Sequence, residues 1–383
     1  MLNGVSSVLT KYCLVSINLT IWFKNGERAL IELALKVDCI YIQFRRTSPI
    51  VKKTTHWVDI KLLCSRRSFN IGVVVKLLYK YMSNPEYFLK EGYIRASQLS
   101  ALNDPFEATY CKEALSDLCP HFEICDSPSE LISYIEENKN KIGVISLTEA
   151  KDNLLMWSHY ANEHKGAVIG FWAKSAFNGN MFTHLHEPRL NSTSLFEGFE
   201  MFHGECLPVM YRKQPRYRVD RFDFDYSNIS AEGQDRILFE IFQQKSDEWI
   251  YEKEHRVTLR LDQADKIIVS DVHRLKNKHV LSQLLAIGSE DENGRFTVYL
   301  DKISDEIVRE AYANNLVELS FDPSSLYLFK VGHVNSIIYG LNVSQSTIDS
   351  YQEDLHNYRH IEQWKASLNH DFYTLEFSEI ERT

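Results

Sequence analysis

Two glutamates and an arginine alternate along one short stretch of the chain, at Glu252, Glu254 and Arg256. If residues 249–258 form a strand, the two-residue period puts these three side chains on one face together with Ile250. Nearby carboxylates raise each other's pKa, and an adjacent guanidinium lowers it. The pattern therefore predicts one proton-sharing acid beside one fixed negative charge, which suits acid–base catalysis. A solvated strand face with a cross-strand ion pair is the alternative that the spacing leaves open.

The Glu-x-Glu spacing also resembles that of mono-ADP-ribosyltransferases, in which such a motif at the start of a strand holds the ribose of NAD and orients an acceptor. That chemistry passes through an oxocarbenium-like state, which a buried carboxylate stabilises electrostatically. The resemblance implies NAD as the substrate. It also implies Glu254 as the ribose-binding carboxylate and Glu252 as the partner that orients the acceptor, with Arg256 beside them.

Earlier in the chain, the strand-like LYKY segment offers Tyr79 and Tyr81, and the next predicted strand offers Ser97. In the same transferases an early strand supplies a His, Arg or Tyr to the nicotinamide ribose side of the site. The resemblance therefore implies that these three residues shape a nicotinamide pocket. This hypothesis requires the tyrosines and the glutamates near position 254 to face the same hollow.

The block WSHYANEHKGAVIGF, which begins at Trp157, joins a predicted helix to a predicted strand. Helical spacing puts Trp157, Tyr160 and Ala161 on one face, while Gly166 permits a turn and a close backbone approach. We expect Trp157 in the core. Tyr160 and His159 are candidate cofactor-binding residues, because an aromatic ring can stack on a planar ligand and an imidazole exchanges protons near neutral pH. A structural role for both stays open.

The block NDPFE, from Asn103 to Glu107, has the composition of a turn. Asn103 can bond to the backbone two residues further on, and such Asn, Asp and Pro residues favour turns. We expect this structural role. The alternative is that Asp104 and Glu107 direct their carboxylates into a cleft and form the wall of a site.

The apolar periodicity predicts strands and helices in an irregular order. Predicted strands cover residues 73–81, 93–97, 141–148, 166–172, 256–261, 266–270, 326–331, 336–341 and 372–377, and predicted helices cover 84–92, 152–162, 230–245, 301–315 and 343–358. Residues 173–230 show few periodic signals, so we expect loops that lie over a site. Because strands and helices do not alternate regularly, the sequence favours an α+β fold with a mixed, mainly antiparallel sheet and flanking helices. An ADP-ribosyltransferase-like fold is the more specific hypothesis.

The first part of the chain differs in charge from the rest. Residues 1–75 hold 11 Lys or Arg and 4 Asp or Glu, a net charge of +7, and since the whole chain carries −9 the remaining residues carry −16. A piece of this size buries little surface alone. We therefore expect residues 1–72 to form a basic N-terminal extension, in which residues 29–36 favour a helix, before a main domain at 73–383. Nucleic-acid contacts are expected only through the basic segment, because phosphate binding needs clustered positive charge.

Seven cysteines are scattered along the chain without a CxxC pair, which is typical of a reducing compartment. Cys119, His121 and Cys125 fit no common zinc spacing, and we predict no metal. No apolar run reaches the roughly 18–20 residues of a membrane span. The expected location is therefore the cytoplasm, without membrane contact.

Several common catalytic motifs are missing from the sequence. There is no GxxxxGK[ST] loop, no GxGxxG after a strand, no HExxH and no GxSxG. These absences argue against a P-loop ATPase, a Rossmann dehydrogenase, a zincin protease and a common serine hydrolase.

Five blocks, in this order and at about this spacing, resemble the bacterial family known as domain of unknown function 2971 (DUF2971). The blocks are LYKYMS at 78–83, GYIRASQLSALNDPFE at 92–107, ISLTEAKDNLLMWSHYANEHKGAVIGFW at 145–172, KSDEWIYEKEHRVTL at 245–259 and IIYGLNVS at 337–344. The resemblance covers roughly residues 77–380 and implies a shared fold. It does not bring a known reaction with it.

Two hypotheses about function remain open. The first is an ADP-ribosyltransferase-like or NAD-consuming enzyme that acts on an unknown macromolecule. The second is a non-catalytic module that binds a nucleotide or a protein in a bacterial stress or phage-defence setting. Unchanged NAD turnover in a Glu254→Gln variant would count against the first.

Overall fold

The computed structural model divides the chain into two compact units, which are described separately. One unit comprises Met1–Lys76 with Lys174–Gly179, and the other comprises Leu77–Ala173 with Asn180–Thr383. The residues that the structure describes are 15–22, 28–36, 39–42, 57–64, 67–74, 76–118, 127–174, 181–182, 202–214, 231–332, 334–355 and 361–380.

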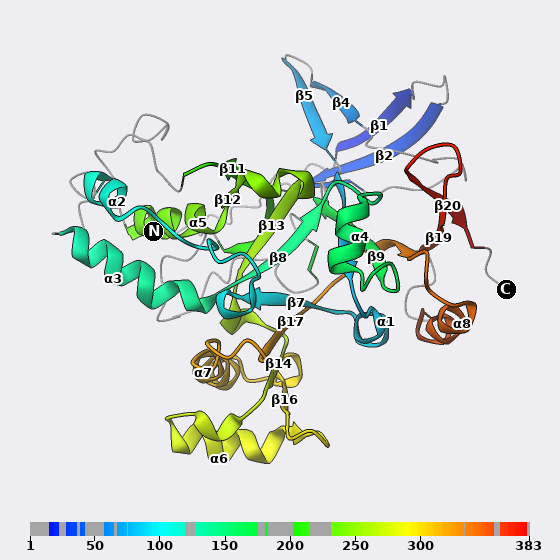
Figure 1. Cartoon of the computed structure of the whole chain (residues 1–383). Coiled ribbons are helices and arrows are strands. Elements are labelled where there is room, and N and C mark those ends of the chain that lie inside the picture. Colours follow the sequence, from blue (N-terminus) through cyan, green and yellow to red (C-terminus); the bar gives the residue numbers. More distant parts are fainter. Residues whose placement is uncertain are drawn as a thin grey trace, which may run out of the picture. The chain divides into compact units, whose positions relative to one another are not determined.

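The described part of the first unit consists of strands (Figure 1). Strands β1 (Val15–Trp22), β2 (Arg28–Lys36) and β3 (Cys39–Ile42) form an antiparallel sheet, and β4 (Trp57–Cys64) pairs with β5 (Arg67–Val74). The prediction of a helix at residues 29–36 is therefore wrong. This segment pairs with β1 along its whole length, and such ladder pairing outweighs a local helix preference.

The second unit is built on one large sheet. Among the described residues its strands are β6 (Lys76–Met82), β7 (Tyr93–Gln98), β8 (Ile142–Thr148), β9 (Ala167–Lys174), β10 (His203–Pro208), β13 (Glu254–Arg260), β14 (Lys266–Val269), β15 (Ser289–Glu290), β16 (Phe296–Tyr299), β17 (Leu326–Lys330), β18 (Val334–Tyr339), β19 (Glu362–Leu368) and β20 (Leu375–Glu379). Every strand pair of this sheet with a described register runs antiparallel, except β18 and β19, which are parallel. The predicted α+β fold with a mainly antiparallel sheet is confirmed.

Helices flank this sheet. They are α1 (Glu86–Glu91), α2 (Lys112–Leu118), α3 (Pro128–Asn138), α4 (Leu154–Tyr160), α5 (Ala231–Phe242), α6 (Lys278–Ile287), α7 (Glu306–Val317) and α8 (Gln345–Asp354). Side chains cap several of them, as when Asn153 accepts hydrogen bonds from the first amides of α4 and Ser344 accepts one at the start of α8. β11 (Met210–Arg212) and β12 (Gln244–Ser246) form a small parallel pair, in which β12 directly follows α5 in the sequence. Figure 1 labels this pair next to α5.

The central ladder of β8 and β13 carries a different chemistry on each face. Glu254 pairs with Thr148 and Arg256 with Ser146, and because directly paired residues project to one side these four share a face. The opposite face contributes Val257 to the main hydrophobic core. Further along the polar face, α3 and α5 pack on the strands through a second apolar cluster. The fold thus presents charged side chains at one end of a covered sheet face.

Candidate functional site

A short helix precedes the glutamate strand. Residues Asp247–Glu252 form a short 3-10 helix rather than the first half of a strand, and Lys253 then adopts a left-handed conformation with φ of 45°. The predicted strand over residues 249–258 is therefore wrong in its first half. As a result Ile250, which strand geometry would place beside the glutamates, is 61% exposed.

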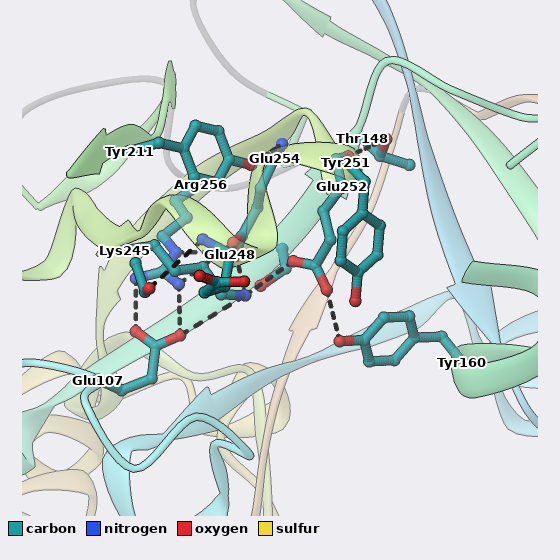
Figure 2. A network of polar contacts seen from close by, with 12 residues as sticks. Glu107, Thr148, Tyr160, Tyr211, Lys245, Glu248, Tyr251, Glu252, Glu254 and Arg256 are labelled. Carbon is teal, nitrogen blue, oxygen red and sulfur yellow. Dashed lines mark hydrogen bonds and ion pairs between the residues drawn. The ribbon is translucent and has the colours of Figure 1, made fainter. Parts of the chain in front are cut away.

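Five charged side chains form a continuous network around the start of β13 (Figure 2). Lys245 Nζ donates to Glu252 Oε2 at 2.7 Å and to Glu254 Oε2 at 3.1 Å. Arg256 Nε donates to Glu254 Oε1 at 2.8 Å. The same guanidinium forms a two-bonded pair with Glu107, with distances of 2.7 and 2.5 Å. The predicted convergence of Glu252, Glu254 and Arg256 is present, although Glu252 reaches it from the 3-10 helix.

Three neutral hydroxyl groups form hydrogen bonds with Glu252 and Glu254. The hydroxyl of Tyr160 donates to Glu252 Oε1 at 2.6 Å, and Thr148 Oγ1 donates to the Glu252 carbonyl at 2.6 Å. The Glu254 N–H donates to the hydroxyl oxygen of Tyr211 at 2.7 Å. These bonds fix the 3-10 turn against both β8 and β11, so the positions of the carboxylates are set from several elements.

The network is closed to solvent in the structure. The side chains of Lys245, Glu252, Glu254, Glu107 and Arg256 are between 1% and 8% exposed. Buried charges require opposite charges and hydrogen bonds to offset their lost hydration. Glu254 contacts both cations and Glu107 is paired with Arg256, whereas Glu252 shares one lysine and otherwise meets a neutral tyrosine. Glu252 is thus the least neutralised carboxylate of the three.

The surroundings shift the protonation of these groups in opposite directions. Burial acts to raise the pKa of the Glu254 carboxyl, but the charges of Arg256 and Lys245 outweigh it and lower this pKa to about 2. Burial raises the pKa of Glu107 despite its pairing with Arg256. Both oxygens of Glu107 accept hydrogen bonds from the guanidinium, which requires the ionised form at neutral pH. The pKa of the Tyr160 hydroxyl is raised by burial and by Glu252.

A further lysine lies near the network without an ion pair to it. Lys80 Nζ donates to the Ser146 carbonyl at 3.1 Å. Burial lowers the pKa of Lys80 to about 8, while the charges of Glu254 and Glu252 oppose this shift. Lys80 on β6 therefore adds a second, weaker source of positive charge near Glu254 and Glu252.

Tyr79 and Tyr81 belong to an aromatic cluster beside the network. Tyr81 packs edge-on against Trp157 with ring centroids 5.3 Å apart, and its hydroxyl donates to the Ala150 carbonyl at 2.9 Å. Tyr79 and Tyr160 pack against the same cluster. Only Tyr160 links this cluster to Glu252 by a hydrogen bond among the bonds of the described side chains. The expected core position of Trp157 is confirmed, since it is fully buried.

The other two proposed cofactor-binding residues lie apart from the carboxylates. Ser97 pairs with Val144, at the part of β8 remote from Thr148, where Glu254 pairs. His159 is exposed on α4, with its ring 6.3 Å from that of Tyr160. The structure therefore brings Tyr160 to the glutamates and leaves Ser97 and His159 outside the network. Their roles stay predictions.

Sequence reasoning missed Lys245 and Tyr211 and gave Glu107 only as an alternative. In the NDPFE block it is Asp104, not Asn103, that closes the turn, by accepting the Phe106 N–H at 2.9 Å. This turn aims Glu107 inward at Arg256. Of the two carboxylates in the alternative interpretation of this block, Glu107 points into the closed charged network and Asp104 closes the turn.

A strained turn holds Tyr160 in place. Residues 162–164 are all non-glycine residues with positive φ, from 47° to 67°, a conformation that costs about 1 kcal/mol or more per residue. The N–H of Asn342 donates to the His164 carbonyl at 3.0 Å. Gly340 makes this approach possible, because a Cβ there would lie 2.1 Å from the same oxygen. The surrounding structure thus fixes the end of α4 against β18.

Residues 156–257 match the family model described as protein of unknown function (DUF2971). This match confirms the resemblance over that segment of the chain. No curated protein and no solved structure matches the chain. The DUF2971 segment begins in α4 and ends in β13, so it contains Tyr160, Lys245 and the alternating charged residues of β13. Glu107 and Thr148 precede it.

Some predicted features lie outside the described residues, including Cys119, His121 and Cys125. Across the residues that are described, no group of three or more His, Cys, Asp or Glu side chains is arranged to hold a metal ion. In the same residues, no helix combines the length and apolar character needed to cross a membrane.

Proposed function

We propose that the DUF2971 segment forms an NAD-consuming site that transfers ADP-ribose to a macromolecule. The observation that carries this proposal is the position of Glu252. Its carboxylate meets a tyrosine hydroxyl and a shared lysine, while the two neighbouring carboxylates are fully paired with cations. Such an incompletely neutralised, buried carboxylate stabilises a developing positive charge.

The charge distribution assigns separate roles to the two glutamates. Glu254 is fixed by Arg256 and Lys245, and its low pKa keeps it ionised. It therefore serves as a positioning residue rather than as the ribose ligand that its place in the motif implied. Glu252 becomes the group that faces the reacting sugar, with Tyr160 as its hydrogen-bond donor.

The proposed reaction breaks the bond between the ribose C1′ and the nicotinamide nitrogen. The bonding electron pair goes to the nitrogen, so the cationic pyridinium leaves as neutral nicotinamide and the ribosyl group takes the positive charge. An acceptor oxygen or nitrogen then bonds to C1′ and loses its proton to Glu252, which is general-base catalysis. The products are nicotinamide, the ADP-ribosylated acceptor and a proton.

Aromatic side chains next to Glu252 suit a planar cationic ring. Tyr251 lies beside Glu252 and Tyr160 in Figure 2, and the Trp249 ring lies 6.1 Å from that of Tyr251. Aromatic faces attract cations and stack on planar groups. Since Glu252 is covered in the structure, the proposal requires the partly buried Tyr251 side chain to rotate when NAD enters.

An interaction module is the second candidate, because apolar side chains are exposed next to the same turn. Leu154 and Leu155 at the start of α4 are 42% and 51% exposed, and Ile250 is 61% exposed. Asn153 joins the two elements by donating to the Tyr251 carbonyl at 2.8 Å. Such neighbouring apolar groups suit a protein partner. For either candidate we propose a bacterial cytoplasmic setting, such as a stress or phage-defence response.

The test is nicotinamide release from NAD by the purified full chain, with and without a bacterial lysate as a source of acceptors. Glu252→Gln keeps the volume and removes the charge, so we expect release to fall by about 100-fold or more. Glu248→Gln, an exposed change in the same 3-10 helix, is the matched control and is expected to keep full activity.

Two results would contradict the enzyme. One is the absence of nicotinamide release by the wild type, and the other is full release by a folded Glu252→Gln variant. If the wild type consumes no NAD, its expression slows bacterial growth, and Leu155→Asp alone abolishes that effect, the interaction module replaces the enzyme.

A further inference from the structure

Of the two cations paired within the charged network, Lys245 is the less firmly held. Its Nζ atom donates to one oxygen each of Glu252 and Glu254, and Glu107 Oε1 lies 3.9 Å from it, beyond hydrogen-bonding distance (Figure 2). Among the described residues, Arg256 donates five hydrogen bonds, two of them as a fork to Glu107. A lysine carries a compact charge on a flexible stem, whereas the arginine fork is rigid. Lys245 therefore leaves the network more readily than Arg256.

The Lys245 ammonium lies in surroundings that also suit an organic cation. It contacts the two carboxylates, and it lies 4.7 Å from the centroid of the Trp249 ring. The Tyr251 ring extends this aromatic wall, with its centroid 6.1 Å from that of Trp249. Aromatic faces beside negative charge are the groups with which proteins bind organic cations. Trp249 is only partly buried, so a ligand can approach the wall from the solvent.

Charge balance restricts what can replace this ammonium. The Glu252 and Glu254 side chains are 4% and 2% exposed, and a buried carboxylate that loses its counter-ion is strongly destabilised. Burial acts to lower the pKa of Lys245, but the charges of Glu254 and Glu252 outweigh it and raise this pKa, so the ammonium is charged at neutral pH. A neutral ligand in its place would leave both carboxylates without this partner. A cationic ligand would replace one positive charge by another.

We propose that Lys245 is an exchangeable internal cation, which the pyridinium ring of NAD displaces from Glu252 and Trp249 when it binds. This role rests on the proposed function, since it takes NAD as the substrate. It adds Lys245 as the residue that selects the oxidised, positively charged form. The reduced dinucleotide has an uncharged ring at this position and cannot replace the ammonium.

The same exchange promotes release of the product. Cleavage of the bond to the ribose C1′ converts the pyridinium ring into neutral nicotinamide, which no longer neutralises the carboxylates. The Lys245 ammonium then returns to Glu252 and Glu254, because its stem keeps it close by at a high effective concentration. Lys245 thus opposes rebinding of the product as well as entry of neutral rings.

Calorimetric titration of the full chain with two small probes tests this exchange without NAD turnover. 1-Methylnicotinamide carries the pyridinium charge, and 3-methylbenzamide is a neutral molecule of the same shape. The wild type should bind the cation at least about tenfold more tightly than the neutral amide. Glu252→Gln should remove most of this preference, because it removes one of the two carboxylates that the cation contacts.

Two substitutions of Lys245 should change the affinity for 1-methylnicotinamide in opposite directions. Lys245→Ala removes the internal competitor, so this variant should bind the cation about tenfold more tightly than the wild type. Lys245→Arg keeps the charge but holds the carboxylates with a rigid fork, so it should bind the cation about tenfold more weakly. The matched control is Lys253→Ala, which removes an exposed lysine next to the 3-10 helix and should leave the affinity unchanged.

The exchange is ruled out if the wild type binds neither probe or binds both equally. It is also ruled out if Lys245→Arg binds the cation as the wild type does, a test that holds even where Lys245→Ala does not fold. Nicotinamide release from NAD together with equal binding of the two probes would overturn the exchange and leave the enzyme in place. Selective binding of the cation without NAD consumption would support the exchange and remove the proposed reaction.

Discussion

The two ends of the β8–β13 ladder differ in how deeply their charged side chains are buried. At the end where Glu254 pairs with Thr148, the charged side chains are at most 8% exposed and each contacts an opposite charge. At the end where Arg260 pairs with Ile142, the Arg260 and Asp262 side chains are 12% and 13% exposed beside an open pocket. One register thus places charges in a closed network at one end and in a less deeply buried ion pair beside a pocket at the other.

Both ends have the same strand pattern but differ in burial. Burial therefore decides how much stability is lost when one partner of an ion pair is removed. Removing one member of a buried pair leaves an unhydrated charge behind, whereas water replaces a lost partner near the surface. The closed end should therefore respond strongly to single substitutions. The open end should respond more weakly.

Arg256→Met should have the largest effect. It removes the guanidinium that holds Glu107 and Glu254, so the free energy of unfolding should fall by about 3–5 kcal/mol. Urea denaturation measures this change. The matched control is Arg309→Met, which breaks the more exposed pair with Glu306 and should cost less than about 1 kcal/mol. Equal stability of the two variants would contradict the comparison between the ends.

The alternation of Glu254 and Arg256 was predictable because both lie within β13, where the period of two holds. The position of Glu252 was predicted for the wrong reason. A serine cap at Ser246 and a left-handed Lys253 form a turn before the strand, and a non-glycine residue in this conformation gives little signal in the sequence.

The partners of the network come from places that local patterns do not connect. Glu107 lies 149 positions from Arg256, and Lys245 precedes the 3-10 helix without a periodic relation to the strand. The mixture of helical and strand periodicities predicted the α+β class correctly. It did not predict strand β2, because the pairing of β2 with β1 outweighed a local helix preference. The pocket was not predictable either, since it forms where the ends of α3, β13 and α7 meet.

Acidification should weaken the closed end next. The Glu254 carboxyl has a pKa lowered from 4.5 to about 2 in the folded protein. Its ionised form therefore stabilises the fold fully above pH 4.5, and this contribution is lost as the pH falls from 4.5 to about 2. A shift of this size corresponds to roughly 3 kcal/mol.

Urea denaturation at several pH values between 5 and 3 tests whether the stabilisation by ionised Glu254 is lost on acidification. The Glu254→Gln variant is the comparison. Glu107 acts in the opposite direction, because its raised pKa makes the folded state hold a proton more readily than the unfolded state. The difference between wild type and Glu254→Gln cancels the part due to Glu107 to first order. A difference that stays constant over this range would show that Glu254 is not held as an ionised group.

Asp262→Asn should have the smallest effect, and it tests the open end directly. The substitution removes one charge of the Arg260 pair beside the pocket, where water can reach the guanidinium. The free energy of unfolding should fall by about 1 kcal/mol or less, measured by the same urea denaturation as for Arg256→Met. Adding salt should reduce the effect further, because screening weakens exposed pairs more than buried ones. The opposite result is a loss of unfolding free energy that equals that of Arg256→Met and does not depend on salt. It would show that water is excluded from the Arg260–Asp262 pair as fully as from the closed network. The charges around the pocket would then contribute to stability as the buried network does.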